Sequence, residues 1–239
     1  MKKISSKEFV KKLKVLSKTK KGYAKAVKKA VKKPQDENYW RARQKDDKER
    51  DWGYGKDNWV EDYSASVDHP HRATIVELLK TFEWAYLLEV GCSSGPNLKL
   101  IRDAFPDKAL FGMDVNADSV MEAKKFLPDN VAVRQGAVNH IHFIDGYFDV
   151  VLADAVLMYT TPEDIERAMK EIDRVAKRAV LIVDRFAENE EITGHVWGRN
   201  YTRILEDMGY SVMEVPMTEE LWPTSKNWQK YGRYFLALK

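Results

Sequence analysis

The strongest constraint on the fold comes from residues 87–98, where a short apolar run ends in an acidic residue and breaks into small residues. An apolar run followed at once by glycine is typical of a central strand of a parallel sheet, here over residues 85–90. Apolar side chains then recur at helical spacing over residues 97–105. Gly91 and Gly95, in the turn between them, permit backbone conformations and a close ligand approach that side chains would prevent. The stretch therefore predicts a strand, a ligand-binding turn and a helix.

Acidic residues stand at the tips of this strand and of the next one. Glu89 lies near the end of the first strand, and Asp114 ends a second apolar run, residues 109–114. Dinucleotide-binding folds place a carboxylate about 20 residues after the glycine turn, where it binds ribose hydroxyls. We therefore expect Asp114 to hold a ribose, and Glu89 to hold a cationic amino group or a ribose hydroxyl. Helix capping is the alternative role of Asp114, although Asn116 and Asp118 are also available as caps.

Strand and helix patterns alternate along the rest of the chain. Further strands are expected over residues 131–137, 147–157, 179–184, 210–215 and 234–238, and helices over residues 162–176 and 200–208. Alternating elements of this length predict an α/β fold, in which a doubly wound, mostly parallel sheet carries helices on both faces. A chain of 239 residues is long enough for one such domain and an appendage.

The glycine turn does not match the dinucleotide fingerprint G-x-G-x-x-G. It resembles the first motif of class I S-adenosylmethionine-dependent methyltransferases, E/D-x-G-x-G-x-G, with Ser93 at the position of the second glycine. Asn97, two residues after Gly95, is included among the residues of this motif. The resemblance extends over about residues 69–239. It implies a seven-stranded sheet whose last strand is antiparallel and lies between its two predecessors, and it implies S-adenosylmethionine as the cofactor.

The resemblance also implies roles for residues around that cofactor. The turn after the third strand would contact adenine, and because this turn lacks the usual acid, backbone groups or Gln135 would do so. Asp149, in the sequence F-D-V-V, would be structural. The cofactor-binding residues expected on this basis are Glu89, Gly91, Ser93, Gly95, Asn97, Asp114, Val115, Gly136, Ala137 and Asp154.

Methyl transfer is an in-line displacement at a carbon that the sulfonium already activates, so the enzyme chiefly aligns the acceptor with the methyl group. A base is needed only if the acceptor loses a proton, and the candidates are Asp154, Tyr159, His71 and His195. Residues 154–157 lack the Asn/Asp-Pro-Pro-Tyr motif for exocyclic amino groups. The expected function is therefore methyl transfer to a small-molecule acceptor. The alternatives are an RNA methyltransferase acting on a hydroxyl or ring atom, and an inactive RNA-binding module with the same fold.

The cysteine and histidine content argues against disulfide and metal chemistry. Cys92 is the only cysteine, which excludes an intrachain disulfide and fits a reducing cytoplasm. His69 and His71, like His140 and His142, form a pair without nearby cysteine, so no metal is expected. No apolar run reaches the about 18 residues that suggest a membrane span. The sequence leaves the oligomeric state open.

Charge and aromatic content divide the chain into three segments. Residues 1–33 contain 14 lysines and one acid, a net charge of +13, so the rest of the chain carries −10 of the total of +3. We expect two short basic amphipathic helices in this extension, an aromatic-rich lid or linker over residues 34–72, and the methyltransferase domain over residues 73–239. Trp59 and Tyr63 lie four residues apart and would share one face of a lid helix.

The basic extension has more than one interpretation. Lysines without arginine favour a nonspecific attraction to phosphates, such as those of RNA. An anionic membrane surface would attract the same charges. Alternatively, the extension packs on the acidic body of its own chain or remains a solvated tail.

If residues 1–33 bind RNA, we expect the affinity to fall steeply with salt, with a log–log slope of about −0.7 for each single-strand phosphate neutralised. Deleting residues 1–33 then flattens the slope and leaves cofactor affinity nearly unchanged, because the cofactor turn lies in the acidic body. Salt titrations of RNA binding by the two chains measure this. A truncated chain that keeps the affinity and the salt dependence, and that melts at a lower temperature, would identify the extension as a packing element.

Overall fold

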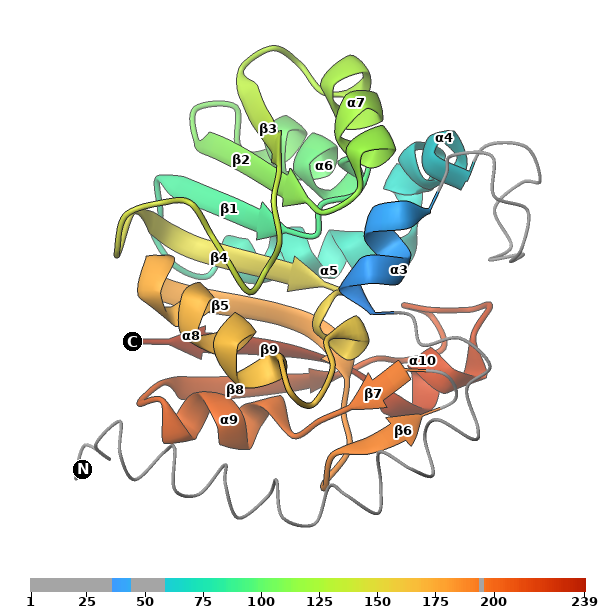
Figure 1. Cartoon of the computed structure of the whole chain (residues 1–239), viewed down its shortest axis with the longest axis vertical. Coiled ribbons are helices and arrows are strands. Elements are labelled where there is room, and N and C mark those ends of the chain that lie inside the picture. Colours follow the sequence, from blue (N-terminus) through green and yellow to red (C-terminus); the bar gives the residue numbers. More distant parts are fainter. Residues whose placement is uncertain (1–35, 44–58, 194–195) are drawn as a thin grey trace.

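The computed structural model of the chain describes residues 36–43, 59–193 and 196–239, which build one seven-stranded sheet flanked by helices (Figure 1). The strands, in the order in which they lie across the sheet, are β3 (Val131–Gln135), β2 (Ala109–Asp114), β1 (Tyr86–Val90), β4 (Phe148–Asp154), β5 (Ala176–Arg185), β9 (Gly232–Leu238) and β8 (Ser211–Pro216). Neighbours from β3 to β5 are parallel, whereas β9 is antiparallel to both β5 and β8. The expected sheet, with its last strand between its two predecessors, is confirmed.

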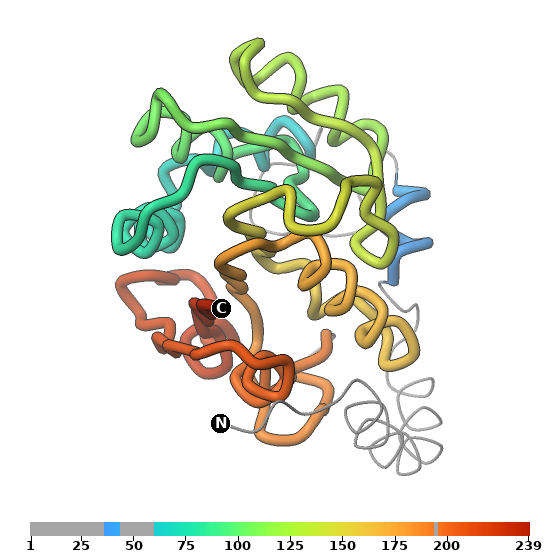
Figure 2. The backbone as a smooth tube through the Cα atoms, turned by 90° about the vertical axis from the view of Figure 1, so that its left-hand side faces the viewer, coloured from blue at the N-terminus to red at the C-terminus, as the bar shows by residue number. Residues whose placement is uncertain are grey.

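Alternating side chains of the strands form two apolar layers, one on each face of the sheet. Leu87 and Val150 belong to one layer, and their chain neighbours Leu88 and Val151 belong to the other. The first layer packs against α5 (Pro70–Leu79), α6 (Pro96–Ala104), α7 (Ala117–Phe126) and α10 (Lys226–Tyr231), and the second against α8 (Ile165–Val175) and α9 (Tyr201–Asp207). Figure 2 shows α5 and α8 on opposite sides of the strands. Burial on both faces explains the almost continuous apolar strands of the sequence.

Some elements differ from the sequence predictions. Helix α8 begins at Ile165 rather than at residue 162, because residues 162–164 form a turn in which Ile165 N donates to Thr161 O (3.0 Å). The hairpin of β6 (Glu191–Thr193) and β7 (Val196–Gly198) is missing from the predictions, since three residues carry too little periodicity to identify a strand. The short elements before the sheet and after β4 are α3 (Glu37–Ala42), α4 (Trp59–Ser64), η1 (Ala65–Asp68) and η2 (Leu157–Tyr159).

Two of the sequence expectations concern parts of the chain that the structure does not describe. The basic helices of residues 1–33 and His195 both lie outside the described residues. Helix α5 begins at Pro70 and thus crosses the boundary between residues 72 and 73 that the sequence analysis sets between the lid segment and the methyltransferase domain. In the described ranges, no helix combines the length and the apolar character that crossing a membrane requires.

The carboxyl ends of β1 to β4 meet at one edge of the sheet, and the strand order reverses between β1 and β4. Open α/β sheets bind ligands at such a reversal. Backbone hydrogen bonds fix the turns there: Gly91 N donates to Met113 O (2.7 Å), and Ala155 N donates to Val183 O (2.8 Å). Ala155 itself has a φ of 56°, a left-handed conformation that is uncommon for a residue with a side chain. The turns that follow β1 and β4 are thus tied to the neighbouring strands.

Asp149 links the starts of β1 and β4 at the opposite edge of the sheet. Its Oδ2 accepts hydrogen bonds from Ala85 N (2.8 Å) and Tyr86 N (3.1 Å). Its Oδ1 lies 3.3 Å from Arg178 Nε. The carboxylate therefore satisfies two backbone donors that would otherwise be left without a partner where β1 begins.

We expect Asp149→Ala to lower the free energy of unfolding by about 2–3 kcal/mol, because it removes a charged acceptor from two backbone donors. Chemical denaturation measures the change. The matched control is Asp145→Ala, which removes an exposed carboxylate that pairs with Arg174 (2.8 Å) on the surface. The control should change stability by less than about 0.5 kcal/mol. Equal effects of the two substitutions would contradict a structural role for Asp149.

Candidate active site

A cavity of about 230 Å³ opens at the edge where the strand order reverses. Its floor comes from the turns after β1, β2, β3 and β4, and its walls come from α3, α4, α5 and the segment before β9. The residues that line it are Glu37, Trp40, Arg43, Tyr63, His71, Arg72, Gly91, Ser93, Asp114, Val115, Ser119, Gly136, Ala137, Val138, Asn139, Asp154, Ala155, Val156, Met158, Tyr159, Thr160, Thr161, Asp164, Trp222 and Trp228. Most of the predicted site residues are among them, but Glu89, Gly95 and Asn97 are not.

The turn after β1 takes backbone conformations that favour small residues. Gly91 has a φ of 70°, and a Cβ there would lie 2.1 Å from a methyl carbon of Val156. Ser93, at the position of the second motif glycine, has a φ of 48°, so it takes the left-handed conformation that glycine adopts without strain. Gly95 has a φ of 88°, and a Cβ there would lie 2.6 Å from a methyl carbon of Leu127. The turn thus keeps the shape of the motif although one glycine is replaced.

Asp114 lies on the cavity wall and is held by the turn after β1. Its Oδ2 accepts from Ser93 N (2.8 Å), and its Oδ1 accepts from Asn116 N (2.8 Å). Burial raises the pKa of Asp114 above its ordinary value, and the backbone hydrogen bonds oppose that shift. The cap of α7 is Asn116, whose Oδ1 accepts from Ser119 N (2.9 Å). Asp114 is therefore not the capping residue, and its carboxylate faces the cavity.

The turn after β3 forms the next part of the wall. Gly136 and Ala137 line the cavity together with Val138 and Asn139. Gln135 does not, because its side-chain amide is turned away and donates to Val115 O (2.9 Å). The side chain of Gln135 is therefore not placed to contact a ligand in the cavity.

Asp154, at the tip of β4, accepts hydrogen bonds from three side chains on two helices, α5 and α6. Its Oδ2 accepts from His71 Nε2 (3.0 Å), Arg72 Nη1 (3.3 Å) and Asn97 Nδ2 (2.9 Å). Burial alone would raise the pKa of Asp154, but His71, Arg72 and Asn97 outweigh it and lower the pKa to about 2. Its Oδ1 is buried and has no hydrogen-bond partner among the described residues. Asp154, which lines the cavity, thus has one charged oxygen that accepts no hydrogen bond from the described residues.

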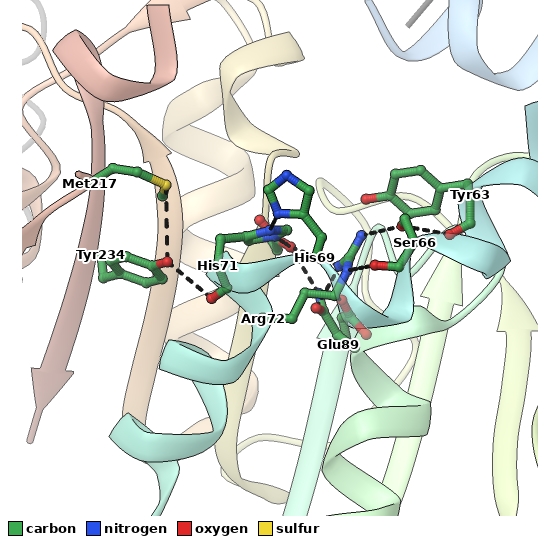
Figure 3. Close-up of polar contacts among 10 residues, drawn as sticks. Tyr63, Ser66, His69, His71, Arg72, Glu89, Met217 and Tyr234 are labelled. Carbon is green, nitrogen blue, oxygen red and sulfur yellow. Dashed lines mark hydrogen bonds and ion pairs between the residues drawn. The ribbon is translucent and has the colours of Figure 1, made fainter. Parts of the chain in front are cut away.

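Arg72 is buried and uses its guanidinium to join α5 to the strand tips (Figure 3). Its Nε donates to Ser66 O (3.0 Å) and its Nη2 to Ser66 Oγ (2.9 Å). Its Nη1 donates to Asn97 Oδ1 (2.6 Å) as well as to Asp154. The aromatic ring of Tyr63 lies 5.1 Å from the guanidinium carbon. Arg72 therefore holds the segment before α5 against the site.

Glu89 lies behind the cavity wall rather than on it. Its Oε1 accepts from Asn97 Nδ2 (2.7 Å), and its Oε2 is buried without a partner among the described residues. Burial, which dominates, raises the pKa of Glu89 to about 8, so the carboxyl group holds a proton at neutral pH. Asn97 connects Glu89 to Asp154 and Arg72. Asn97 therefore acts in the structure as a bridge between side chains rather than as a cavity-lining group.

The predicted catalytic residues His71 and Tyr159 both line the cavity. His71 Nδ1 lies 2.6 Å from His69 Nδ1, and the ring of His71 lies 4.5 Å from that of Trp222. The hydroxyl of Tyr234 donates to His71 O (3.0 Å), which fixes the backbone at this point (Figure 3). Burial raises the pKa of Tyr159, so its hydroxyl keeps its proton. The two histidine rings and Trp222 form one packed group.

Aromatic side chains from distant parts of the chain complete the cavity. Trp222 and Trp228 stack with ring centroids 4.3 Å apart, and Trp40 meets Tyr159 at 4.9 Å. Helix α3 is held in place because Asn116 Nδ2 donates to Trp40 O (2.8 Å) and to the backbone oxygen of Arg43 (2.7 Å), the residue after the helix. The sequence analysis missed the two stacked tryptophans, since nothing in their local pattern relates them to a cofactor turn more than a hundred residues earlier.

Other residues considered from the sequence lie elsewhere. Cys92 is buried, and burial raises the pKa of its thiol well above the ordinary value. The rings of His140 and His142 meet edge to face, with centroids 4.2 Å apart, and neither residue lines the cavity. Over the described ranges, no cluster of three or more histidine, cysteine, aspartate or glutamate side chains could hold a metal ion.

The raised pKa of Glu89 predicts a pH-dependent stability. Between its ordinary value of 4.5 and about 8, the folded chain holds a proton that the unfolded chain has lost. Stability therefore falls as pH rises through this range, by up to about 1.4 kcal/mol per pH unit. Glu89→Gln retains an acceptor for Asn97 and removes the titration. We expect the variant to gain stability relative to the native chain as pH rises, as measured by denaturation at several pH values.

The control for this prediction is Glu83→Gln, because the side chain of Glu83 is 97% exposed and its replacement removes no buried proton. Burial also raises the pKa of Asp184, to about 7, but Asp184 is present in both chains and cancels in the difference. Stability curves of Glu89→Gln and the native chain that run parallel from about pH 5 to about pH 8 would contradict a buried proton on Glu89.

Comparison with known proteins identifies the domain. Residues 88–183 match the methyltransferase domain family. This range begins in β1, contains the glycine turn and the strand tips that carry Asp114 and Asp154, and ends within β5. The comparison with curated proteins found no significant match.

Solved structures share the fold at low sequence identity. Magnesium protoporphyrin IX methyltransferase from Synechocystis PCC 6803 with bound S-adenosylhomocysteine is 14% identical over 77% of this chain and 89% of that chain, with a TM-score of 0.58. The methyltransferase domain of bacterial CtHen1-C is 15% identical over 72% and 98% of the respective chains, with a TM-score of 0.59. A chain of the Haloferax volcanii complex between the Trm112 methyltransferase activator and a methyltransferase is 16% identical over 75% and 95%, also with a TM-score of 0.59. Residues 88–183, less than half of the chain, thus match a methyltransferase domain, and the sheet that contains them has the topology that the resemblance to class I S-adenosylmethionine-dependent methyltransferases implies.

Proposed function

We propose that this methyltransferase acts on a small organic acceptor that binds in the same cavity as the cofactor. The observation that carries this proposal is the shared cavity itself. Asp114 and the turn after β3 line one part of it, and His71 and Trp222 line another. The walls from α3, α4 and α5 partly enclose this cavity, which suits a compact molecule better than a polymer.

The residues present fit S-adenosylmethionine. The carboxylate of Asp114 would accept hydrogen bonds from the ribose hydroxyls, and the backbone of Gly136 and Ala137 would lie beside the adenine. Gly91 leaves the turn after β1 without a Cβ where one would meet Val156. The free Oδ1 of Asp154 suits a cationic ammonium group, because a buried anionic oxygen without a partner is costly. When bound, the cofactor supplies a methyl group on a sulfonium centre.

The roles of Glu89, Gly95 and Asn97 would be indirect. Gly95 shapes the turn at the start of α6, with a φ of 88°. Asn97 holds Asp154 through a hydrogen bond of 2.9 Å, and Glu89 accepts from the same amide group. These three residues would thus support the cofactor site from behind the cavity wall, where burial fixes their positions.

The chain's own residues would align the acceptor and manage its proton. Tyr159 keeps its proton because burial raises its pKa, so it is better suited to donate a hydrogen bond than to act as a base. Asp154 has a pKa of about 2 and already accepts three hydrogen bonds, so it orients its neighbours rather than taking a proton. Of the candidate bases that lie in the described residues, His71 is left for proton removal.

Asp114→Ala should weaken S-adenosylhomocysteine binding by about tenfold to a hundredfold, because the ribose hydrogen bonds are worth roughly 1.5–3 kcal/mol. Titration calorimetry with the full chain measures the affinity. Asp129→Ala is the matched control, since Asp129 is exposed and lies outside the cavity. Asp114→Asn keeps one acceptor for the two backbone donors, Ser93 N and Asn116 N. This variant shows whether a loss of affinity in Asp114→Ala comes from unfolding rather than from the missing ribose contacts. Equal affinity of Asp114→Ala and the native chain would contradict the cofactor site.

Methyl transfer from radiolabelled S-adenosylmethionine tests the acceptor. We expect label in a pool of small organic molecules, and we expect the chain without residues 1–33 to retain this activity, because the cavity is built from later residues. Label that enters only RNA, and that is lost with residues 1–33, would reject a small-molecule acceptor and favour the RNA alternative.

A further inference from the structure

The turn after β3 carries a polar side chain that the fold itself does not use. Gly136, Ala137, Val138 and Asn139 line the cavity in succession. Of these four residues, Asn139 alone has a side chain that forms hydrogen bonds. Its amide group has no hydrogen-bond partner within the part of the chain that the structure describes. Because Asn139 is only partly buried, it is accessible from the cavity that it lines.

Backbone hydrogen bonds fix the turn on both sides of Asn139. Gly136 N donates to Asp114 O (2.9 Å), and His140 N donates to Ala137 O (3.0 Å). The first of these bonds joins the turn to the residue whose carboxylate is proposed to hold the ribose. The backbone that carries the Asn139 amide is thus in place before a ligand binds, which reduces the entropy lost on binding.

Gln135, which the sequence analysis expects to contact adenine, has a different role. Its Nε2 donates to Val115 O (2.9 Å), and this bond joins the ends of β3 and β2. Gln135 does not line the cavity. Of the residues of this turn that do, the groups able to form hydrogen bonds with a base are therefore the backbone and the amide of Asn139.

An asparagine amide is complementary to the edge of an adenine ring. The amide has an oxygen that accepts hydrogen bonds beside an NH₂ group that donates them. Adenine presents its 6-amino group, a donor, beside a ring nitrogen that accepts, and asparagine pairs with both at once. A purine ring without the 6-amino group offers only the ring nitrogen, so it leaves the amide oxygen without a partner.

We propose, as a step that rests on the proposed function, that Asn139 recognises the adenine of S-adenosylmethionine. Its Oδ1 accepts from the 6-amino group, and its Nδ2 donates to the adjacent ring nitrogen. Asn139 is then a specificity-determining residue, which selects adenine over purine rings that lack the amino group. The contact takes the place of the acid that this turn lacks.

The first experiment compares two ligands by titration calorimetry with the full chain. They are S-adenosylhomocysteine and its analogue with purine in place of adenine. The native chain should bind S-adenosylhomocysteine about tenfold to a hundredfold more tightly, which is the discrimination expected of one bidentate pair. Asn139→Ala should bind the two ligands with nearly equal affinity. Asn139→Asp should keep part of the preference, because a carboxylate still accepts from the 6-amino group.

The matched control is Asn130→Ala, because Asn130 is exposed and lies outside the cavity. This variant should keep the native preference between the two ligands. The melting temperature of ligand-free Asn139→Ala should equal that of the native chain, because the substitution removes no hydrogen bond within the described residues. Lost affinity would then not come from unfolding.

The second experiment observes the amide directly. Nitrogen-15 NMR of the full chain detects side-chain NH₂ groups, and Asn139→Ala identifies the signals of Asn139. Adding S-adenosylhomocysteine should shift these signals, and the purine analogue should shift them less. Signals that stay unchanged when S-adenosylhomocysteine binds would overturn the proposal.

The remaining outcomes are distinct. A preference for adenine that persists in Asn139→Ala overturns the proposal, because the backbone would then recognise the base. Equal losses of affinity for both ligands would make Asn139 a packing residue and overturn it as well. A native chain that binds both ligands equally well overturns the role of Asn139 and leaves the proposed function standing. A native chain that binds neither ligand overturns the proposed function, and this inference with it.

Discussion

The site depends on one buried charge, the carboxylate of Asp154. This carboxylate lies at the tip of β4, and it accepts hydrogen bonds from α5, through His71 and Arg72, and from α6, through Asn97. A buried carboxylate without such donors would be protonated or would destabilise the fold by several kcal/mol. The position of α5 is therefore coupled to the ionisation of a group on the central sheet. Because the carboxylate needs these donors, α5 lies where its residues His71 and Arg72 also form part of the cavity wall.

Most of the sheet could be predicted from the sequence, because its strands are buried on both faces. Residues 109–114 form β2 within the predicted bounds, and every residue of β4 is buried. Apolar runs of this kind have few alternative interpretations when acids and glycines follow them at regular spacing. The order of the strands, by contrast, came from the resemblance rather than from periodicity. Local patterns carry no information about which strands are neighbours, particularly for the antiparallel β9.

Some residues of the candidate site could be placed from the sequence, and others could not. Residues in the turns after the strands, such as Asp114 and Gly136, could be predicted to approach one another, since parallel strand ends meet at one edge. Trp222 and Trp228 could not, because only the tertiary fold brings them to the histidines. From the sequence, His69 was considered as a metal ligand and as part of the lid segment over residues 34–72. Its relation to His71 depends on a contact of 2.6 Å between two ring nitrogens, which no sequence pattern encodes.

Several features of the site lower the stability of the fold, and they occur together. Ser93 and Ala155 have left-handed backbones, with φ values of 48° and 56°, and each costs of order 1–2 kcal/mol for a residue that has a Cβ. Glu89 holds a proton that an exposed carboxyl group would lose at neutral pH. Strain and buried polar groups persist only where the surrounding packing determines them, and here that packing is the two apolar layers of the sheet. The stability of the sheet is thus what allows strained turns and a protonated acid to lie together at the carboxyl ends of its strands.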